Sequence, residues 1–237
     1  MDHIDEGNNG RLYTSKSGVI KVQKRRSLGH TIMTQKKIHT LLESLISELH
    51  LEVLTVPKLN TENTSQYEME YIQTEKIIYL GDLHTSHEIS HELYEKIVSE
   101  FTVLWIALFS HGFAAWDIEL FLQPNGKVML LDFDKYGIVS TKDTTIVMPH
   151  WTADQNQQAL KYFFQNSCFP QDFVTRLLAK GFRLPSCMIF WFFDSLILYS
   201  RSILSSESYS GQSLWIDSKT FQSLFKNLLL RNLFIEQ

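Results

Sequence analysis

Four carboxylates gather around one predicted β-hairpin in residues 116–137, WDIELFLQPNGKVMLLDFDKYG. Asp117 and Glu119 precede or open the first apolar run, and Asp132 and Asp134 follow the second. Residues two positions apart share one face of a strand, and the Asn-Gly pair between the runs favours a two-residue type I′ turn. That register pairs Glu119 with Asp132 and Asp117 with Asp134. The sequence therefore predicts four carboxylates on one face of the hairpin.

Like charges that face each other across a sheet destabilise it, so these acids need a compensating group. A divalent cation, a nearby lysine or raised carboxylate pKa values would each relieve the repulsion. Among metals, oxygen-only ligands favour Mg²⁺ or Mn²⁺. The alternative is that both strands simply end at solvent, where acids are well hydrated. Four acids on one face, beside an apolar strand, favour a functional site.

The elements around the hairpin predict an α+β protein with two lobes. Short β-branched or alternating runs indicate strands, and apolar residues three or four positions apart indicate helices. The strands are expected within residues 12–24, 53–59 and 67–72, and the helices over 34–49, capped by Thr31 or Thr34, and 90–110. Residues 1–75 would form a small β-rich N-lobe. Residues 76–237 would form a mainly helical C-lobe, helical for most of its length after Thr152.

The order of these elements resembles the protein kinase-like fold over about Leu12–Gly137. GKVMLLDFDKYG is similar to the hairpin and metal-binding DFG segment of that fold. VIKV, with Lys21, is similar to the strand that carries the phosphate-contacting lysine. QKKIHTLLESL resembles the helix that follows, and YEMEYI resembles the strand that enters the hinge. The D-x-E strand followed by D-F-D is similar, more narrowly, to an uncharacterised fungal kinase-like family.

This resemblance implies an atypical phosphotransferase that binds ATP and Mg²⁺ between two lobes. It implies that Asp132, Glu119 and Asp134 hold the metal, with Glu119 where kinases have an asparagine. The implied nucleotide-binding residues are Lys21, Gln35, Met69 at the gatekeeper position, and Glu70 and Tyr71 in the hinge.

Departures from the kinase pattern leave phosphoryl transfer open. The catalytic loop of kinases reads H-R-D-x-x-x-x-N, but its aspartate position falls here on Ala114. The nearest carboxylate, Asp117, is therefore the expected catalytic residue. Gln35 stands where a glutamate normally pairs with Lys21, and a glutamine can accept a hydrogen bond without balancing the charge. These departures also fit a pseudokinase that binds nucleotide or protein, and Lys21 has the alternative of a strand lysine in solvent.

A zinc-hydrolase motif is present as well. His87-Glu88-Ile89-Ser90-His91 matches H-E-x-x-H, in which two histidines on one helix face bind Zn²⁺ and the glutamate acts as a base. The motif needs a third ligand and a buried helix. Its polar surroundings favour an exposed helix N-terminus instead.

Composition narrows the class of partner. The 237 residues include 22 Lys and Arg against 26 Asp and Glu, a net charge of −4, so no nucleic-acid partner is expected. Two cysteines and no apolar leader favour an intracellular protein, cytoplasmic or nuclear. The most membrane-like stretch, 187–204, is interrupted by Asp194 and Arg201, which predicts a buried helix rather than a membrane span. A nucleotide and, for a pseudokinase, a protein are the expected partners.

Overall fold

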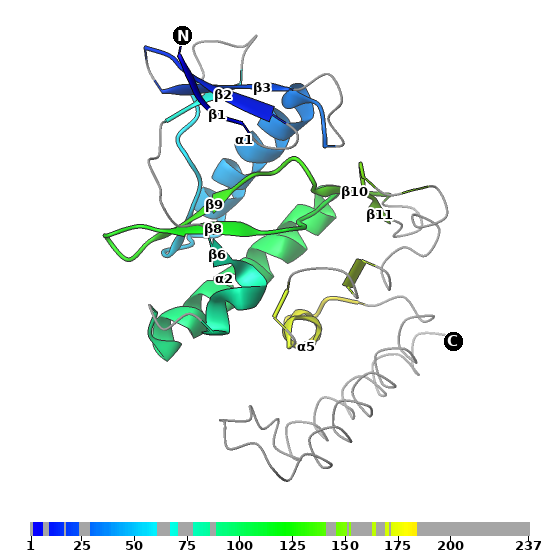
Figure 1. Cartoon of the computed structure of the whole chain (residues 1–237). Helices are drawn as coiled ribbons and strands as arrows, with labels where there is room; N and C mark the ends of the chain where they lie inside the picture. The colour runs from blue at the N-terminus through cyan, green and yellow to red at the C-terminus, as the bar shows by residue number, and fades with distance from the viewer. Residues whose placement is uncertain are drawn as a thin grey trace, which may run out of the picture. The chain divides into compact units, whose positions relative to one another are not determined.

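The computed structural model describes residues 2–6, 10–16, 18–23, 29–60, 67–70, 78–85, 89–140, 146–150, 152, 163–164, 169–170 and 172–183. The chain divides into two compact units, Met1–Arg183 and Leu184–Gln237, and the second lies outside the described residues. In the described part the protein is mixed α/β, with three sheets, three α-helices and one 3₁₀ segment (Figure 1).

The strands are β1 (His3–Glu6), β2 (Gly10–Thr14), β3 (Val19–Gln23), β4 (Leu54–Thr55), β5 (Glu68–Met69), β6 (Ile78–Tyr79), β7 (Phe113–Ala114), β8 (Glu119–Leu122), β9 (Val128–Leu131), β10 (Gly137–Val139) and β11 (Ile146–Val147). The helices are α1 (Ile32–Glu48), α2 (His91–Ser110) and α5 (Phe173–Ala179), with the 3₁₀ segment η1 (Leu80–Thr85). Most of the helical region expected after Thr152 lies outside the described residues.

The first sheet is antiparallel, in the order β1-β2-β3-β5. Its centre is the β-branched VIKV run, in which Val19 and Ile20 are buried. Gly18, the residue before β3, lies against β5, since a Cβ there would be only 2.1 Å from the Met69 carbonyl oxygen. A side chain at this position would push the two strands apart.

Helix α1 confirms the helix expected over 34–49 and begins two residues earlier. Its N-cap is Thr31, whose hydroxyl accepts the backbone N–H of Thr34 at 3.3 Å. The buried face carries Ile38, Leu42 and Leu45. Two polar side chains, Gln35 and His39, lie on the same buried face.

The second sheet, in the order β4-β9-β8-β6, contains the predicted hairpin as its two central strands. Strand β4 pairs in parallel with β9 and is tied to α2 through Glu100. The Glu100 carboxylate accepts the backbone N–H groups of Glu52, Val53 and Leu54 at 2.9–3.2 Å. A third sheet, β11-β10-β7, is built from segments that flank the hairpin in sequence. The acids before β8 and after β9 therefore lie in the two short segments of chain that connect the second sheet to the third, between β7 and β8 and between β9 and β10.

The predicted register of the hairpin is wrong by one residue. Glu119 lies opposite Leu131, rather than Asp132, and Leu122 lies opposite Val128. The Gln123 N–H donates to the Lys127 carbonyl, so the turn between these two residues holds three residues. Gly126 in this turn has φ +79°, and its N–H donates to the Gln123 carbonyl. Pro124 explains the difference, because its fixed negative φ suits the first central position of a type I turn. Pro124 therefore belongs to the turn rather than to the first strand, and the pairing of the two strands is shifted by one residue from the predicted register.

Helix α2 confirms the helix expected over 90–110, with Ser90 as its N-cap. The cap also contradicts the zinc-hydrolase reading. Ser90 has an extended backbone (φ −70°, ψ 155°), so His91 does not share a continuous helical turn with the residues before it. His87 and Glu88 lie outside the described residues.

The apolar half of α2 forms an aromatic core with α5. Trp105 and Phe101 are fully buried, and Phe173 of α5 packs against both rings. Within the described ranges no helix has the length and apolar character needed to cross a membrane. The stretch 187–204 lies outside those ranges.

Candidate functional site

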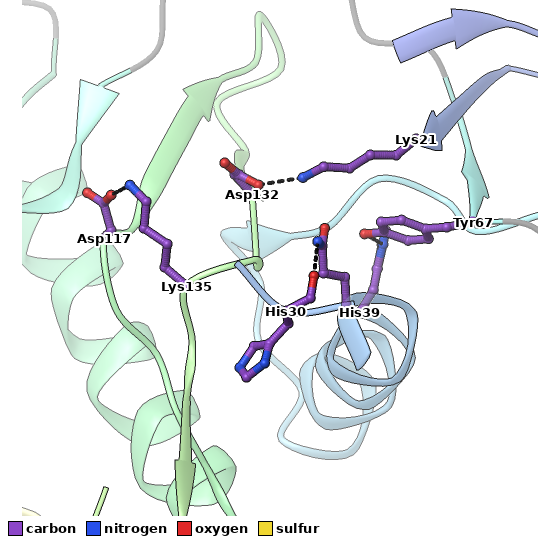
Figure 2. A network of polar contacts seen from close by, with 8 residues as sticks. Lys21, His30, His39, Tyr67, Asp117, Asp132 and Lys135 are labelled. Atoms are coloured by element: carbon purple, nitrogen blue, oxygen red, sulfur yellow. Dashed lines mark hydrogen bonds and ion pairs between the residues drawn. The ribbon is translucent and has the colours of Figure 1, made fainter. Parts of the chain in front are cut away.

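An ion pair joins the lysine of β3 to the first acid after β9. Lys21 Nζ lies 2.6 Å from Asp132 Oδ1, across 111 residues of sequence (Figure 2). The Lys21 side chain is only 13% exposed and that of Asp132 is 34% exposed. Lys21 is therefore not a strand lysine in solvent, and the alternative weighed from the sequence is wrong.

A second ion pair lies on the other side of Asp132 in Figure 2, between Lys135 and Asp117. Glu119 opens strand β8 two residues after Asp117, and the charges of Asp132, Asp117, Lys135 and Asp134 act on its carboxyl group. Its pKa is raised to about 7, mainly by burial, then by the negative charges of Asp132 and Asp117. Lys135 opposes this effect. The charges of Asp132, Asp117 and Asp134 thus all act on Glu119, but the observed register does not form the acid pairs that the sequence predicted.

Asp117 and Asp132, the two acids that pair with lysines, also share an uncommon backbone conformation. Asp117 has φ +52° and Asp132 has φ +48°, in the left-handed region that non-glycine residues seldom adopt. Aspartate tolerates this region better than most residues, because its short side chain bonds locally. Uncommon backbone conformations of this kind concentrate at binding and catalytic sites. Each of these side chains points toward its lysine (Figure 2).

Asp134 lies deeper than Asp132. It is 2% exposed, and a Cβ added at Gly29 would lie 3.0 Å from its Cβ and Cγ atoms. The neighbouring His30 N–H donates to the Asp134 carbonyl at 2.7 Å, and the His30 ring hydrogen bonds to the Tyr136 carbonyl. The segment that follows Asp132 is therefore attached to the loop that leads into α1.

Gln35 supports this loop instead of pairing with Lys21. Its Nε2 donates to the His30 carbonyl at 2.9 Å. Its Oε1 is buried and has no hydrogen-bond partner among the described residues. The glutamine side chain is buried, at 1% exposed. Lys21 takes Asp132 as its partner because a carboxylate neutralises its charge and an amide does not.

The expected hinge residues are described only in part. Met69 ends β5 and pairs with Val19 of β3. Glu70 is exposed, and its backbone N–H donates to the Lys58 carbonyl at 2.9 Å. Tyr71 lies outside the described residues.

Several residues at the site were missed from the sequence: Lys135, His30, His39, Tyr67 and His150. His39 carried a signal, because it is a polar residue on the apolar face of a predicted helix. The pKa of His150 is lowered, first by burial and then by the Lys135 charge, which places the ring near the Asp117 pair. Nothing in its local sequence indicated that position.

The carboxylates at this site supply some, but not all, of the oxygen ligands that a small, hard cation such as Mg²⁺ needs. Within the described ranges, no three His, Cys, Asp or Glu side chains form a group that could hold a metal ion on its own. Magnesium, however, is usually bound through one or two carboxylates, with phosphate oxygens and water completing the shell. Lys21 pairs with Asp132 and Lys135 with Asp117, and the pKa of Glu119 is raised mainly by burial and then by the negative charges of Asp132 and Asp117. Asp132 and Glu119 are the donors that such a cation would use.

Comparison of the chain with protein-family models, with curated proteins and with solved structures finds no match.

Proposed function

We propose that this protein is an atypical kinase-like phosphotransferase that binds ATP and Mg²⁺ at the Lys21–Asp132 pair, with an acceptor of unknown identity. The observation that carries the proposal is the 2.6 Å ion pair between these residues. It brings a cation from β3 to the acidic end of the β8–β9 hairpin. The order of elements along the chain, which resembles a two-lobed kinase-like fold, supports the same proposal.

In this proposal each charged group has a separate task. Lys21 contacts phosphate oxygens, Asp132 and Glu119 hold the metal ion, and the buried Asp134 adds negative charge. Bound Mg²⁺ would neutralise charge on the phosphates. Phosphoryl transfer depends mainly on positioning and charge neutralisation, so these groups supply most of what the reaction needs.

Asp117 is the proposed catalytic residue. Ala114, at the usual position of the catalytic aspartate, is buried in β7 and has no group that could accept a proton. Asp117 comes three residues later, with a side chain 16% exposed. A carboxylate there can orient the acceptor hydroxyl or take its proton, which contributes about 10²–10⁴-fold to rate.

The second candidate is a pseudokinase that binds nucleotide or protein without transfer. The ion pair between Asp117 and Lys135 favours it, because the lysine already occupies the carboxylate that would have to receive the proton of the acceptor. A nucleotide-binding pseudokinase would share its site with the first candidate and differ from it only in turnover.

Nucleotide binding is tested by thermal denaturation with ATP, with and without Mg²⁺, and with the Asp132→Asn variant. We expect ATP with Mg²⁺ to raise the Tm of the wild type, and the variant to lose the Mg²⁺-dependent part of the rise. Equal shifts in both proteins would reject the metal assignment, and no shift in the wild type would reject the function.

Turnover is then measured as release or transfer of the γ-phosphate. Asp117→Asn should reduce it at least about 10²-fold with nearly unchanged nucleotide affinity. His111→Ala, in the only nearby His-Gly pair, is the control and should reduce it far less. Binding without turnover in the wild type would favour the pseudokinase.

A further inference from the structure

A relay of buried hydrogen bonds links His39 of α1 to Tyr67, the residue before β5. His39 is fully buried and Tyr67 is 2% exposed. The His39 Nδ1 atom lies 2.9 Å from the Tyr67 hydroxyl, and Nε2 lies 2.7 Å from the Pro57 carbonyl oxygen. A carbonyl only accepts, so Nε2 carries the hydrogen and Nδ1 of the neutral ring accepts from Tyr67. Both ring nitrogens are therefore committed, and the ring is fixed in orientation.

The fixed ring supports the residue next to Asp132. His39 contacts Phe133 edge to face, with ring centroids 5.1 Å apart. Phe133 is 2% exposed and lies between Asp132 and Asp134 in the chain. A buried aromatic side chain of this size is held by the rings around it. The orientation of His39 thus limits where the backbone of Asp132 can lie.

Tyr67 also holds the other partner of the ion pair. Its backbone carbonyl accepts the N–H of Lys21 at 3.0 Å. The pKa of its hydroxyl is raised well above the usual value, first by burial and then by the negative charge of Asp132. The charge of Asp132 therefore acts on the Tyr67 hydroxyl, and the Tyr67 backbone is hydrogen-bonded to the backbone of Lys21.

We propose that Tyr67 and His39 are positioning residues for the Lys21–Asp132 pair: the Tyr67 backbone fixes Lys21, and its hydroxyl, through His39 and Phe133, fixes Asp132. Through these contacts, a shift in the position of Tyr67 would change the position of Asp132, and the reverse. The consequence of the relay for ligands rests on the proposed function, namely that nucleotide and Mg²⁺ bind at this pair. The relay itself is a property of the fold.

Two tyrosine variants separate the relay from simple packing. Tyr67→Phe removes only the hydroxyl and leaves the backbone bond to Lys21. Tyr136→Phe is the matched control, because Tyr136 is also fully buried and contacts Phe133 at 5.6 Å between ring centroids. Its hydroxyl has no hydrogen-bond partner among the described residues. Both variants lose one buried oxygen beside the same ring, and only Tyr67→Phe breaks the relay.

Amide hydrogen exchange gives a readout that needs no ligand. The His30 N–H donates to the Asp134 carbonyl and reports on the segment after Asp132, whereas the Lys21 N–H reports on the Tyr67 backbone. We expect Tyr67→Phe to speed exchange at His30 by about three- to tenfold, the effect of one lost hydrogen bond, and to leave Lys21 nearly unchanged. Tyr136→Phe should change neither amide. Equal acceleration at both amides in Tyr67→Phe, or none at His30, would overturn the proposal.

Calorimetric titration with ATP adds the functional arm. Tyr67→Phe should weaken binding about three- to tenfold in the presence of Mg²⁺ and leave Mg²⁺-free binding nearly unchanged. A uniform loss under both conditions would mean a general structural role and would overturn the proposal. If the wild type binds no ATP, the proposed function fails, and the exchange measurement alone decides whether the relay exists.

Discussion

Acidification should remove a stabilising contribution that depends on His39. Burial lowers the pKa of its imidazole from 6.5 to about 4, against the opposing effect of the bond to the Pro57 carbonyl. Between these two pH values the unfolded chain binds a proton that the folded protein does not. The free energy of unfolding therefore falls as pH falls through this window, and the contribution is fully present above about pH 6.5. At about 1.4 kcal/mol per pKa unit, the loss amounts to about 3 kcal/mol.

Urea denaturation between pH 7.5 and pH 4 measures this term as a difference between variants. His39→Gln carries no titrating group, so the stability advantage of the wild type over it should shrink by about 3 kcal/mol toward pH 4. Other groups titrate in the same range. The raised pKa of Glu119, due mainly to burial and then to Asp132, acts in the opposite direction. Comparison of two proteins that both keep Glu119 cancels this effect to first order.

Ile38→Val is the matched control, because Ile38 is a fully buried neighbour on α1 without a titrating group. It should cost about 0.5–1.5 kcal/mol at every pH. The reasoning is refuted if the pH profiles of His39→Gln and wild type run parallel, as those of Ile38→Val and wild type should.

Three other variants test the charges around the site. Lys21→Met should lower the free energy of unfolding in urea denaturation by about 1–2 kcal/mol, between the values typical of exposed and buried ion pairs. Lys16→Met, at an exposed position, is the control. Equal effects of the two substitutions would contradict the pairing of Lys21 with Asp132. Asp132→Asn should lower the pKa of Glu119 from about 7, because burial and then Asp132 raise it; carboxyl NMR of the metal-free protein measures this, and an unchanged value would place Asp132 too far away. Glu100→Gln weakens the acceptor of three backbone N–H groups and should cost about 1–3 kcal/mol, whereas the exposed Glu43→Gln should cost almost nothing in the same assay.

Local signals in the sequence were enough to predict the main helices. The cap at Thr31 and the spacing of Ile38, Leu42 and Leu45 determine where α1 begins and which face is buried. The hairpin was also predicted, but its register depended on the turn. Asn-Gly and Pro-Asn compete for the central positions, and a shift of one residue changes every pair. Only the packed structure resolves that competition.

The composition of the site was harder to predict, because its ion pairs join distant segments. Lys21 and Asp132 are 111 residues apart, and no spacing rule reaches that far. The resemblance to kinases put both residues in one site and also suggested Gln35 as the partner of Lys21. Lys21 pairs with Asp132 instead, because this carboxylate lies within reach of the ammonium group and balances its charge.

The left-handed backbone at Asp117 and Asp132 restricts how these positions can change during evolution. Most side chains would strain the backbone there, whereas asparagine and glycine fit with little cost. The mutations best tolerated by the fold are therefore those that erase the negative charge. If Asp117 is the catalytic residue, as proposed, a single change to asparagine or glycine there would remove its carboxylate and leave the backbone of the fold unstrained.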